Sequence, residues 1–202
     1  MIETESSVVT ARDAASWHFD GLSLAFDAGT MRHLSERGLG PGWRCLEVGA
    51  GGGSIARWLA ERVGPEGHVL ATDIDTRCLD GLQDANLEVR CHDIGTDPLT
   101  PEASFDLIHA RLVLAHVPQR EEALARIAGA LKPGGWLVVE EFGLPAWDPS
   151  LHFEPVAPPP LAYQLLQHAT KEGGVVRYGP FLPQRMQALG LCEMGAEGRV
   201  FR

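Results

Sequence analysis

Residues 46–60, LEVGAGGGSIARWLA, constrain the fold of this chain more than any other stretch. The apolar end of a strand runs into an acid, then into four glycines within five positions, and then into an amphipathic helical pattern. Glycine permits a sharp backbone turn and the close approach of a ligand, while Ile55, Leu59 and Val63 give the helix one apolar face. The pattern predicts a strand, a nucleotide-binding turn and a helix, in the order that opens a parallel α/β sheet.

An acid, Glu47, lies two residues before Gly49, the first glycine of this turn. A helix N-terminus favours an anion such as a diphosphate, and a carboxylate at the same turn works against one. A ligand with a cationic head, such as the ammonium and sulfonium groups of S-adenosylmethionine, suits the acid better. The acid therefore favours a cofactor with a cationic head over a diphosphate.

Short apolar runs alternate with helical patterns along the rest of the chain, which is typical of a mostly parallel sheet with helices on both faces. The predicted strands are 44–48, 68–72, 87–91, 105–109, 136–139 and 191–197. The predicted helices are 54–63, 77–85, 119–131 (ended by the KPGG of 132–135), 161–170 and 183–189, with two helical pieces between residues 13 and 39. The expected fold class is α/β: a doubly wound, mostly parallel Rossmann-like sheet in three layers, α/β/α.

The expected organisation is an N-terminal helical cap over residues 1–42, outside the core of the sheet, and one domain over residues 43–202. Gly40-Pro41-Gly42 ends the cap, because glycine and proline break helices. Residues 143–190 are expected to form a loop and helices, since residues 143–160 carry six prolines and almost no periodicity.

The charge of the chain disfavours two classes of partner. Seventeen Lys and Arg against 27 Asp and Glu give a net charge of −10, with no block of basic residues. Nucleic acid and anionic membrane surfaces are therefore not expected as partners. The N-terminus is acidic and polar, and no apolar run approaches the length of a membrane span, so we expect a cytoplasmic protein.

A bound metal is not expected either. The four cysteines are far apart, without the close paired spacing of a zinc site. The eight histidines form no close ligand pairs with cysteines or carboxylates.

Polar residues end or follow four of the predicted strands, at the edge where parallel sheets bind their ligands. They are Glu47, Asp73, Asp93 and His109. Asp73 lies 24 residues beyond Gly49, about the distance at which such folds place an acid for the two ribose hydroxyls. Asp93 could accept a hydrogen bond from an adenine amino group while Ile94 packs on the ring; its alternative is a turn or cap acid. Asp75 is expected to cap the following helix.

In combination, these motifs resemble the class I S-adenosylmethionine-dependent methyltransferases over about residues 43–142, with a looser likeness through the rest. LEVGAGGGS resembles the family's cofactor turn, VLATDID its ribose-binding acid, CHDI its adenine-binding acid, and LKPGGWLVVEE the turn and strand before its active-site edge. The resemblance implies a seven-stranded sheet with an antiparallel last strand, and methyl transfer from S-adenosylmethionine.

The same resemblance implies which residues bind the cofactor. The methionine end would contact the glycine turn, the ribose would contact Asp73, and adenine would contact Ile74 with one face and Asp93 with its amino group. The region from His109 to Arg111 would lie beside the transferable methyl. The expected cofactor-binding residues are Glu47, Gly49, Ala50, Gly51, Asp73, Ile74, Asp93, Ile94 and His109.

Sulfonium is already a good leaving group, so we expect the protein mainly to position the acceptor and to exclude water. An acceptor hydroxyl would need a base, and the candidates are His109, His116, His152, Glu140 and Glu141. Of these, His109 and Glu141 are the predicted catalytic residues. Cofactor contact or packing remains an equal reading of His109, local backbone bonding is the simpler reading of His116, and an ion pair is the default reading of Arg111.

Two departures from the family pattern bear on the acceptor and on the sheet. The Asn/Asp-Pro-Pro-aromatic motif of members that methylate nucleobase or glutamine amides is absent, because this segment reads HARLVLAHVP. We therefore expect a small-molecule acceptor. A strand ending at residue 197 leaves too few residues for the antiparallel strand, so a truncated chain, a miscount by one, or completion by a partner chain each remain open.

Two other functions remain open on the residues alone. An NAD(P)-dependent Rossmann oxidoreductase would use the same kind of glycine turn and acid, but Glu47 weakens it, as does Ser54 where the fingerprint has its last glycine. A non-catalytic cofactor-binding protein with a truncated methyltransferase fold would explain the missing strand and the lack of an obvious base. Oligomerisation is left open as well.

Overall fold

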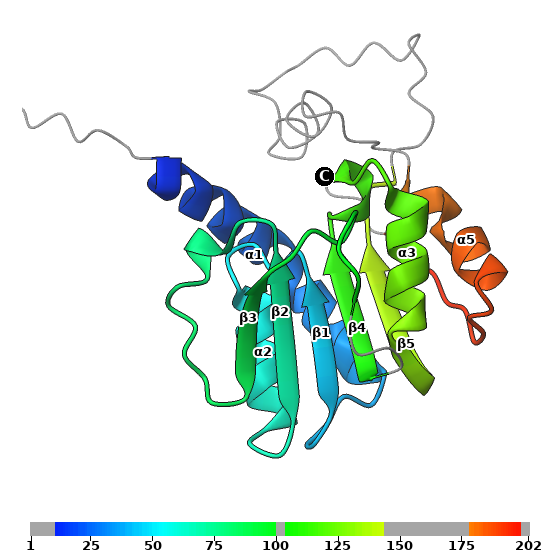
Figure 1. The fold of residues 1–202 in the computed structure, drawn as a ribbon, viewed down its shortest axis with the longest axis horizontal. Helices are drawn as coiled ribbons and strands as arrows, with labels where there is room; N and C mark the ends of the chain where they lie inside the picture. Colours follow the sequence, from blue (N-terminus) through cyan, green and yellow to red (C-terminus); the bar gives the residue numbers. More distant parts are fainter. Residues whose placement is uncertain (1–10, 100–103, 144–177, 199–202) are drawn as a thin grey trace, which may run out of the picture. The chain divides into compact units, whose positions relative to one another are not determined.

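The computed structural model describes residues 11–99, 104–143 and 178–198, with side chains from residue 17 on. Its strands are β1 (Arg44–Val48), β2 (His68–Asp73), β3 (Leu87–Cys91), β4 (Phe105–Arg111) and β5 (Leu131–Glu140). They form a sheet in the order β3-β2-β1-β4-β5 (Figure 1), and the pairs β1–β2, β2–β3 and β4–β5 are parallel. The predicted Rossmann-like, mostly parallel α/β fold class is confirmed. The chain divides into two compact units, residues 1–92 and 93–202.

The first unit is built on three parallel strands. Helix α2 (Ser54–Val63) connects β1 to β2 and packs on both strands through a fully buried apolar face. Its central residues Ile55 and Leu59 are at most 2 % exposed. Gly64 ends the helix with φ 65°, a conformation open to glycine. The predicted strand-turn-helix of residues 44–63 is confirmed at every boundary.

The N-terminal helix α1 (Ala11–Glu36) is continuous, and the prediction of two helical pieces between residues 13 and 39 was wrong. Gly21 and Gly29 lie within it. A glycine lowers helix propensity by about 1 kcal/mol but removes no backbone hydrogen bond, so packing against α2 overrides it. Leu34 and Thr30 are fully buried, so the last turns of this cap also contribute to the core.

The predicted helix at residues 77–85 was also wrong, because a single 3-10 turn, η1 (Thr76–Cys78), takes its place. The Asp75 carboxylate accepts a hydrogen bond from Arg77 N at 3.1 Å and closes that turn. The following residues include Gly81 and polar side chains, which leave no continuous apolar face for a longer helix. The capping interpretation of Asp75 is confirmed.

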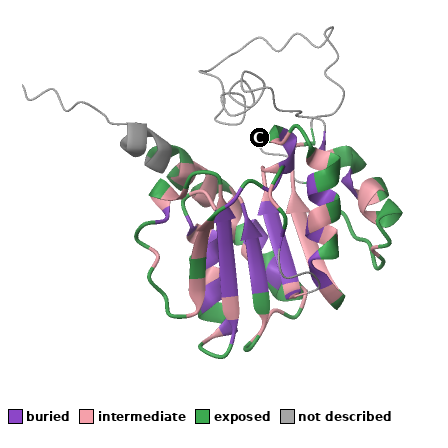
Figure 2. Ribbon diagram, viewed as in Figure 1, coloured by how far each residue is buried: buried purple, intermediate pink, exposed green. Residues whose placement is uncertain are grey.

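The second unit pairs β4 with β5, and helix α3 (Arg120–Gly129) packs on β5 through Leu124 and Ile127. Both strands are longer than predicted. The segment Lys132–Gly135, expected only to end a helix, forms an irregularity inside β5: Phe105 pairs with Leu131, and two residues later Leu107 already pairs with Trp136. Figure 2 shows β1 and β2 largely buried, whereas Trp136 and the residues after it in β5 are only half-buried.

After the ranges that the structure leaves undescribed, a short turn η3 (Gly179–Phe181) leads into α5 (Leu182–Ala188), which confirms the helix predicted at 183–189. The strand predicted at 191–197 was wrong: residues 191–198 form no strand, and Glu193 adopts φ 54°. Side chains here are mostly exposed, so no apolar face anchors a strand. The predicted helix at 161–170 and nearly all of the 143–160 loop lie outside the described residues.

Candidate functional site

The glycine turn after β1 is tied to the end of β2. Gly49, Gly51 and Gly53 have φ of 69°, 55° and 79°, a region that side chains other than glycine rarely adopt. The N–H groups of Gly49 and Ala50 both donate to the carbonyl oxygen of Thr72, at 2.8 and 2.9 Å. The turn is therefore fixed by backbone contacts before any ligand arrives.

Asp73, the last residue of β2, completes this arrangement. Its Oδ2 accepts a hydrogen bond from Gly51 N at 2.8 Å, and its Oδ1 accepts one from Asp75 N at 3.0 Å. Each carboxylate oxygen has room for about two hydrogen bonds, so both retain an acceptor position for ribose hydroxyls. The structure thus brings together the predicted Gly51 and Asp73, 22 residues apart in sequence.

Glu47 and Ile74 flank these two residues with opposite exposure. Glu47 is 4 % exposed at the end of β1, and its carbonyl oxygen accepts a hydrogen bond from the Thr72 hydroxyl at 3.1 Å. Ile74 is 72 % exposed, an uncovered apolar surface next to the ribose-type acid. An exposed isoleucine at this place suits a flat apolar ring such as adenine.

Phe19 of α1 lies against the glycine turn, and the sequence interpretation did not assign it to the site. A Cβ on Gly51 would stand 2.8 Å from Phe19 Cε1, and a Cβ on Gly52 would stand 2.8 Å from Phe19 Cβ. The Ser23 hydroxyl donates to the Ser54 hydroxyl at 3.0 Å and also ties α1 to the start of α2. The only sequence signal was an aromatic residue in the helix that precedes the sheet.

In the second unit, Asp93 and Ile94 serve the local fold. The Asp93 carboxylate accepts from Gly95 N at 2.8 Å, and its own N–H donates to Asp97 Oδ2 at 2.9 Å, as in the turn-acid interpretation. Ile94 is 4 % exposed and therefore offers a ligand little surface, whereas Asp93 is exposed. The Arg126 guanidinium donates to the carbonyl oxygens of Ile94 and Gly95 and fixes this segment to α3.

His109 is paired with Glu140 across β4 and β5. His109 is fully buried, and its Nε2 lies 3.1 Å from Glu140 Oε1. The pair can hold a proton, but full burial keeps the imidazole away from a solvent-borne acceptor in this conformation. His116, which closes the 3-10 turn η2 (Leu114–His116), is exposed, and His152 lies outside the described residues.

Glu141, the other predicted catalytic residue, holds the turn that follows β4. Its Oε1 accepts hydrogen bonds from Val113 N at 3.1 Å and from Ala115 N at 3.2 Å. Burial raises the pKa of Glu141 to about 7, against the opposing effect of these backbone donors and of Arg120. The carboxyl group therefore titrates near neutral pH and also organises the backbone around it.

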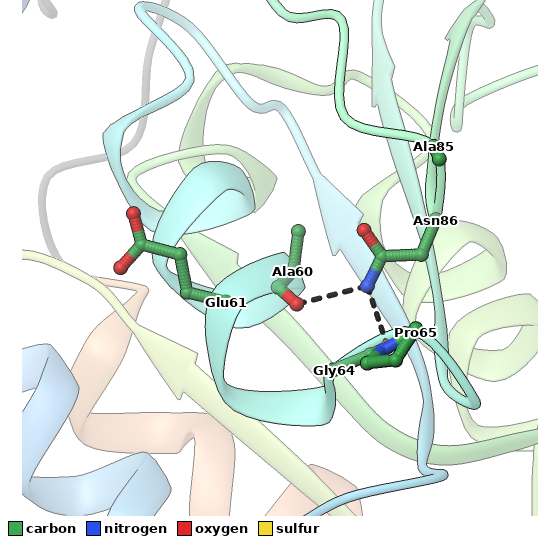
Figure 3. A pocket seen from close by; sticks show the side chains of 6 residues that line it. All are labelled: Ala60, Glu61, Gly64, Pro65, Ala85 and Asn86. Carbon is green, nitrogen blue, oxygen red and sulfur yellow. Dashed lines mark hydrogen bonds between the residues drawn. The ribbon is translucent and has the colours of Figure 1, made fainter.

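A surface pocket lies away from the glycine turn, at the C-terminal end of α2 (Figure 3). The Asn86 side-chain amide crosses it and donates to the carbonyl oxygens of Ala60 and Gly64, at 2.9 and 2.7 Å. These bonds satisfy the end of the helix, so the pocket is accounted for by the fold.

Among the described residues, no three His, Cys, Asp or Glu side chains gather closely enough to hold a metal ion. No helix among them has the length and apolar character needed to cross a membrane.

Comparisons with known proteins agree with this geometry. Residues 46–139 match the family described as methyltransferase domain. The chain is 34 % identical over 119 residues to the ubiquinone/menaquinone biosynthesis C-methyltransferase UbiE of Vibrio vulnificus, covering 55 % of this chain and 46 % of the relative. It is 36 % identical over 122 residues to UbiE of Laribacter hongkongensis, covering 57 % and 49 %. The chain therefore spans about half the length of the curated relatives it matches.

A solved structure shares the fold at lower identity. Haemonchus contortus phosphoethanolamine N-methyltransferase 2, in complex with S-adenosyl-L-methionine, superposes with a TM-score of 0.57 at 20 % identity, covering 76 % of this chain and 34 % of that one.

The parallel sheet and its glycine turn form a Rossmann-like α/β fold, which the solved structure shares. The match over residues 46–139 and the similarity to the UbiE relatives support a class I S-adenosylmethionine-dependent methyltransferase. The resemblance inferred from the sequence is confirmed, and so is S-adenosylmethionine as the cofactor of this family.

Proposed function

We propose that this protein transfers the methyl group of S-adenosylmethionine to a small-molecule acceptor. The observation that carries the proposal is the contact of Asp73 with Gly51 N, beside the exposed Ile74. The contact closes the glycine turn and leaves Asp73 acceptor positions for a ligand. The exposed apolar surface of Ile74 lies beside it in the same unit. Diphosphate cofactors gain nothing from the buried Glu47 at the same turn.

We further propose residue roles at the cofactor end. Glu47, Gly49, Ala50 and Gly51 would hold the methionine end, where the acid offsets the positive charge of the ligand. Asp73 would accept from the ribose hydroxyls with the lone pairs that Gly51 N and Asp75 N leave free. Ile74 would pack on adenine, and Asp93 and Ile94 remain predicted contacts of the adenine ring.

When bound, S-adenosylmethionine supplies an electrophilic methyl group on a sulfonium. This chain's residues then have to orient the acceptor and hold its proton. His109, which is paired with Glu140 and fully buried in this conformation, and Glu141 remain the predicted catalytic residues that would receive that proton. A base matters most for a hydroxyl or ring-carbon acceptor, because both lose a proton on methylation.

The names of the relatives guide the choice of acceptors. Since UbiE is a C-methyltransferase of ubiquinone and menaquinone biosynthesis, reduced quinone rings lead the panel. Small amines and phenols complete it, because the acceptor atom is open. A cytoplasmic location, and the expected lack of nucleic-acid, membrane and metal partners, remain predictions from the sequence.

Two measurements, made one after the other, test the proposal. Isothermal titration with S-adenosylhomocysteine and, separately, with NAD should show binding of the first alone. Methyl-labelled S-adenosylmethionine with the acceptor panel should then give a labelled product. Tight binding of NAD alone would favour the oxidoreductase, while cofactor binding without product across the panel would favour a non-catalytic binding protein.

A further inference from the structure

Two side chains of the second unit each bury a polar atom that has no hydrogen-bond partner in the described parts of that unit. They are Glu141, through Oε2, and Tyr178, through its hydroxyl. Buried polar atoms are almost always paired, because an unpaired one keeps the full cost of its desolvation. The cofactor contacts proposed above use neither atom.

The segment that carries Tyr178 runs against the end of β5. Gly179 N donates to the carbonyl oxygen of Phe142 at 3.4 Å, and a Cβ on Gly179 would stand 3.0 Å from the carbonyl oxygen of Glu141. Burial is the main cause that raises the pKa of Tyr178 to about 12, and the charge of Glu141 contributes.

The other oxygen of Glu141 holds a strained turn. Its Oε1 accepts from Val113 N and Ala115 N, directly after Leu112, which adopts φ 55°. Leu112 N donates to the carbonyl oxygen of Glu140 at 2.8 Å. A leucine in the left-handed region persists only where its surroundings hold it, and such residues gather at functional sites.

We propose that Glu141 is a positioning residue for methyl transfer: through Oε1 it holds residues 111–116 in the conformation that the acceptor side requires. This inference rests on the proposed function only where it assigns the turn to the acceptor side. The hold itself is a property of the second unit, and it can be measured without knowing the acceptor.

The strength of this hold depends on protonation. A carboxylate accepts hydrogen bonds more strongly than a neutral carboxyl, so local openings that break these bonds while Glu141 stays buried become less favourable as pH rises through about 7. Global unfolding, which exposes Glu141 to water, has the opposite pH dependence. The groups that act on Glu141 are Arg120 of α3 and the turn's own N–H groups, and those that act on Tyr178 also include Arg185 and Glu121. Arg120 Cζ and Arg185 Cζ lie 5.8 and 4.9 Å from the Tyr178 ring centre, and the charge of Arg120 favours the Glu141 carboxylate.

Hydrogen exchange of the Val113 and Ala115 amides tests the inference, expressed as protection relative to the intrinsic rate at each pH. In the unmodified protein, protection should rise between about pH 6 and pH 8. Glu141→Gln keeps an acceptor oxygen, so it should retain partial protection without that rise. Glu141→Leu should lose protection about tenfold or more.

Glu122→Gln, an exposed change on α3, is the matched control and should leave the pH profile as it is. A profile in Glu141→Gln that still rises with pH would overturn the inference, even if the leucine variant fails to fold. Titration with S-adenosylhomocysteine separates this from the proposed function. Glu141→Gln should bind it within about twofold of the unmodified protein, whereas a tenfold loss would make Glu141 a cofactor residue and overturn its positioning role. No binding by the unmodified protein would instead contradict the proposed function.

Discussion

The turns after β1 and after β4 solve the same problem with different residues. Both reverse the chain at the carboxyl end of a parallel strand, and both contain backbone with positive φ. The first uses glycines at 49, 51 and 53, whereas the second uses Leu112. In each turn, a carboxylate at the end of the neighbouring strand accepts a hydrogen bond from a backbone N–H of the turn. Asp73, the last residue of β2, does so for the first turn, and Glu141, directly after β5, does so for the second. Glycine leaves the backbone accessible to a ligand, and a leucine does not, so the first turn suits cofactor contact and the second suits a fixed wall.

The strongest challenge to this comparison is Asp73→Ala. The change removes a ribose contact and the partner of Gly51 N, so cofactor affinity should fall by about 1.5–3 kcal/mol, roughly tenfold to 150-fold in Kd. Titration with S-adenosylhomocysteine measures the loss. Asp73→Asn keeps one acceptor oxygen, so its cofactor affinity should lie between those of the unmodified protein and the alanine variant. An unchanged affinity of the alanine variant would remove Asp73 from the site.

Glu141→Leu tests the second turn in the same way but should act on folding rather than on cofactor affinity. It leaves two N–H groups without their acceptor, which costs about 1–3 kcal/mol of unfolding free energy. Urea denaturation at pH 5, below the raised pKa of Glu141, measures the change. Equal stability of the two proteins would mean that the turn is held by other contacts.

The pH dependence of stability distinguishes the two carboxylates further. Burial raises the pKa of Glu141 in the folded protein to about 7. The contribution of Glu141 to the free energy of unfolding is therefore fully present below the pKa it has in the unfolded protein, and it is lost as pH rises from about 4.5 to 7. The loss reaches at most about 1.4 kcal/mol per pH unit. Comparing denaturation at pH 5 and pH 8 with that of Glu141→Gln should show a smaller difference in the variant.

A methyl group added to the first turn should have a moderate effect. Gly53→Ala forces a side chain into φ 79° and brings its Cβ to 2.7 Å from Leu82 Cδ1. We expect a loss of about 1–2 kcal/mol in unfolding free energy. Gly134 also has positive φ but has open space around it, so Gly134→Ala isolates the backbone cost from the clash.

The smallest effect is expected at Leu112. Leu112→Gly relieves backbone strain but gives up half-buried apolar surface, so the two changes should cancel to within about 1 kcal/mol. Leu112→Val places a β-branched residue at positive φ and should destabilise the protein more than glycine does. Thermal denaturation of the two variants side by side checks the order, and a more stable valine variant would contradict it.

The contrast between the two turns also explains how far sequence reasoning reached. The first turn could be predicted to the residue, because glycines and the spacing from Gly49 to Asp73 are local signals. The role of Glu141 could not, since its partners Val113 and Ala115 are 28 and 26 residues away and carry no distinctive side chains. Sequence reasoning selected Glu141 as a titrating group near the active-site edge but gave no indication that it binds the backbone.

The errors in secondary structure have the same origin. The helix predicted at 77–85 is only a 3-10 turn, because Gly81 and the polar residues around it leave no continuous apolar face to pack. The strand predicted at 191–197 failed because alternating apolar residues need a surface to pack on, and these residues remain mostly exposed. The continuous α1 was missed because packing of Leu34 outweighs two unfavourable glycines.

The bonds from Gly49 N and Ala50 N to Thr72, and from Gly51 N to Asp73, have a kinetic consequence. Because these bonds close the turn in the free protein, ligand binding does not have to order this segment. Binding therefore costs the protein little conformational entropy at the turn. Encounter with the turn should then be limited by diffusion and orientation instead of by a slow rearrangement. Differences in affinity among ligands that share the adenosine group should accordingly arise from their dissociation rates.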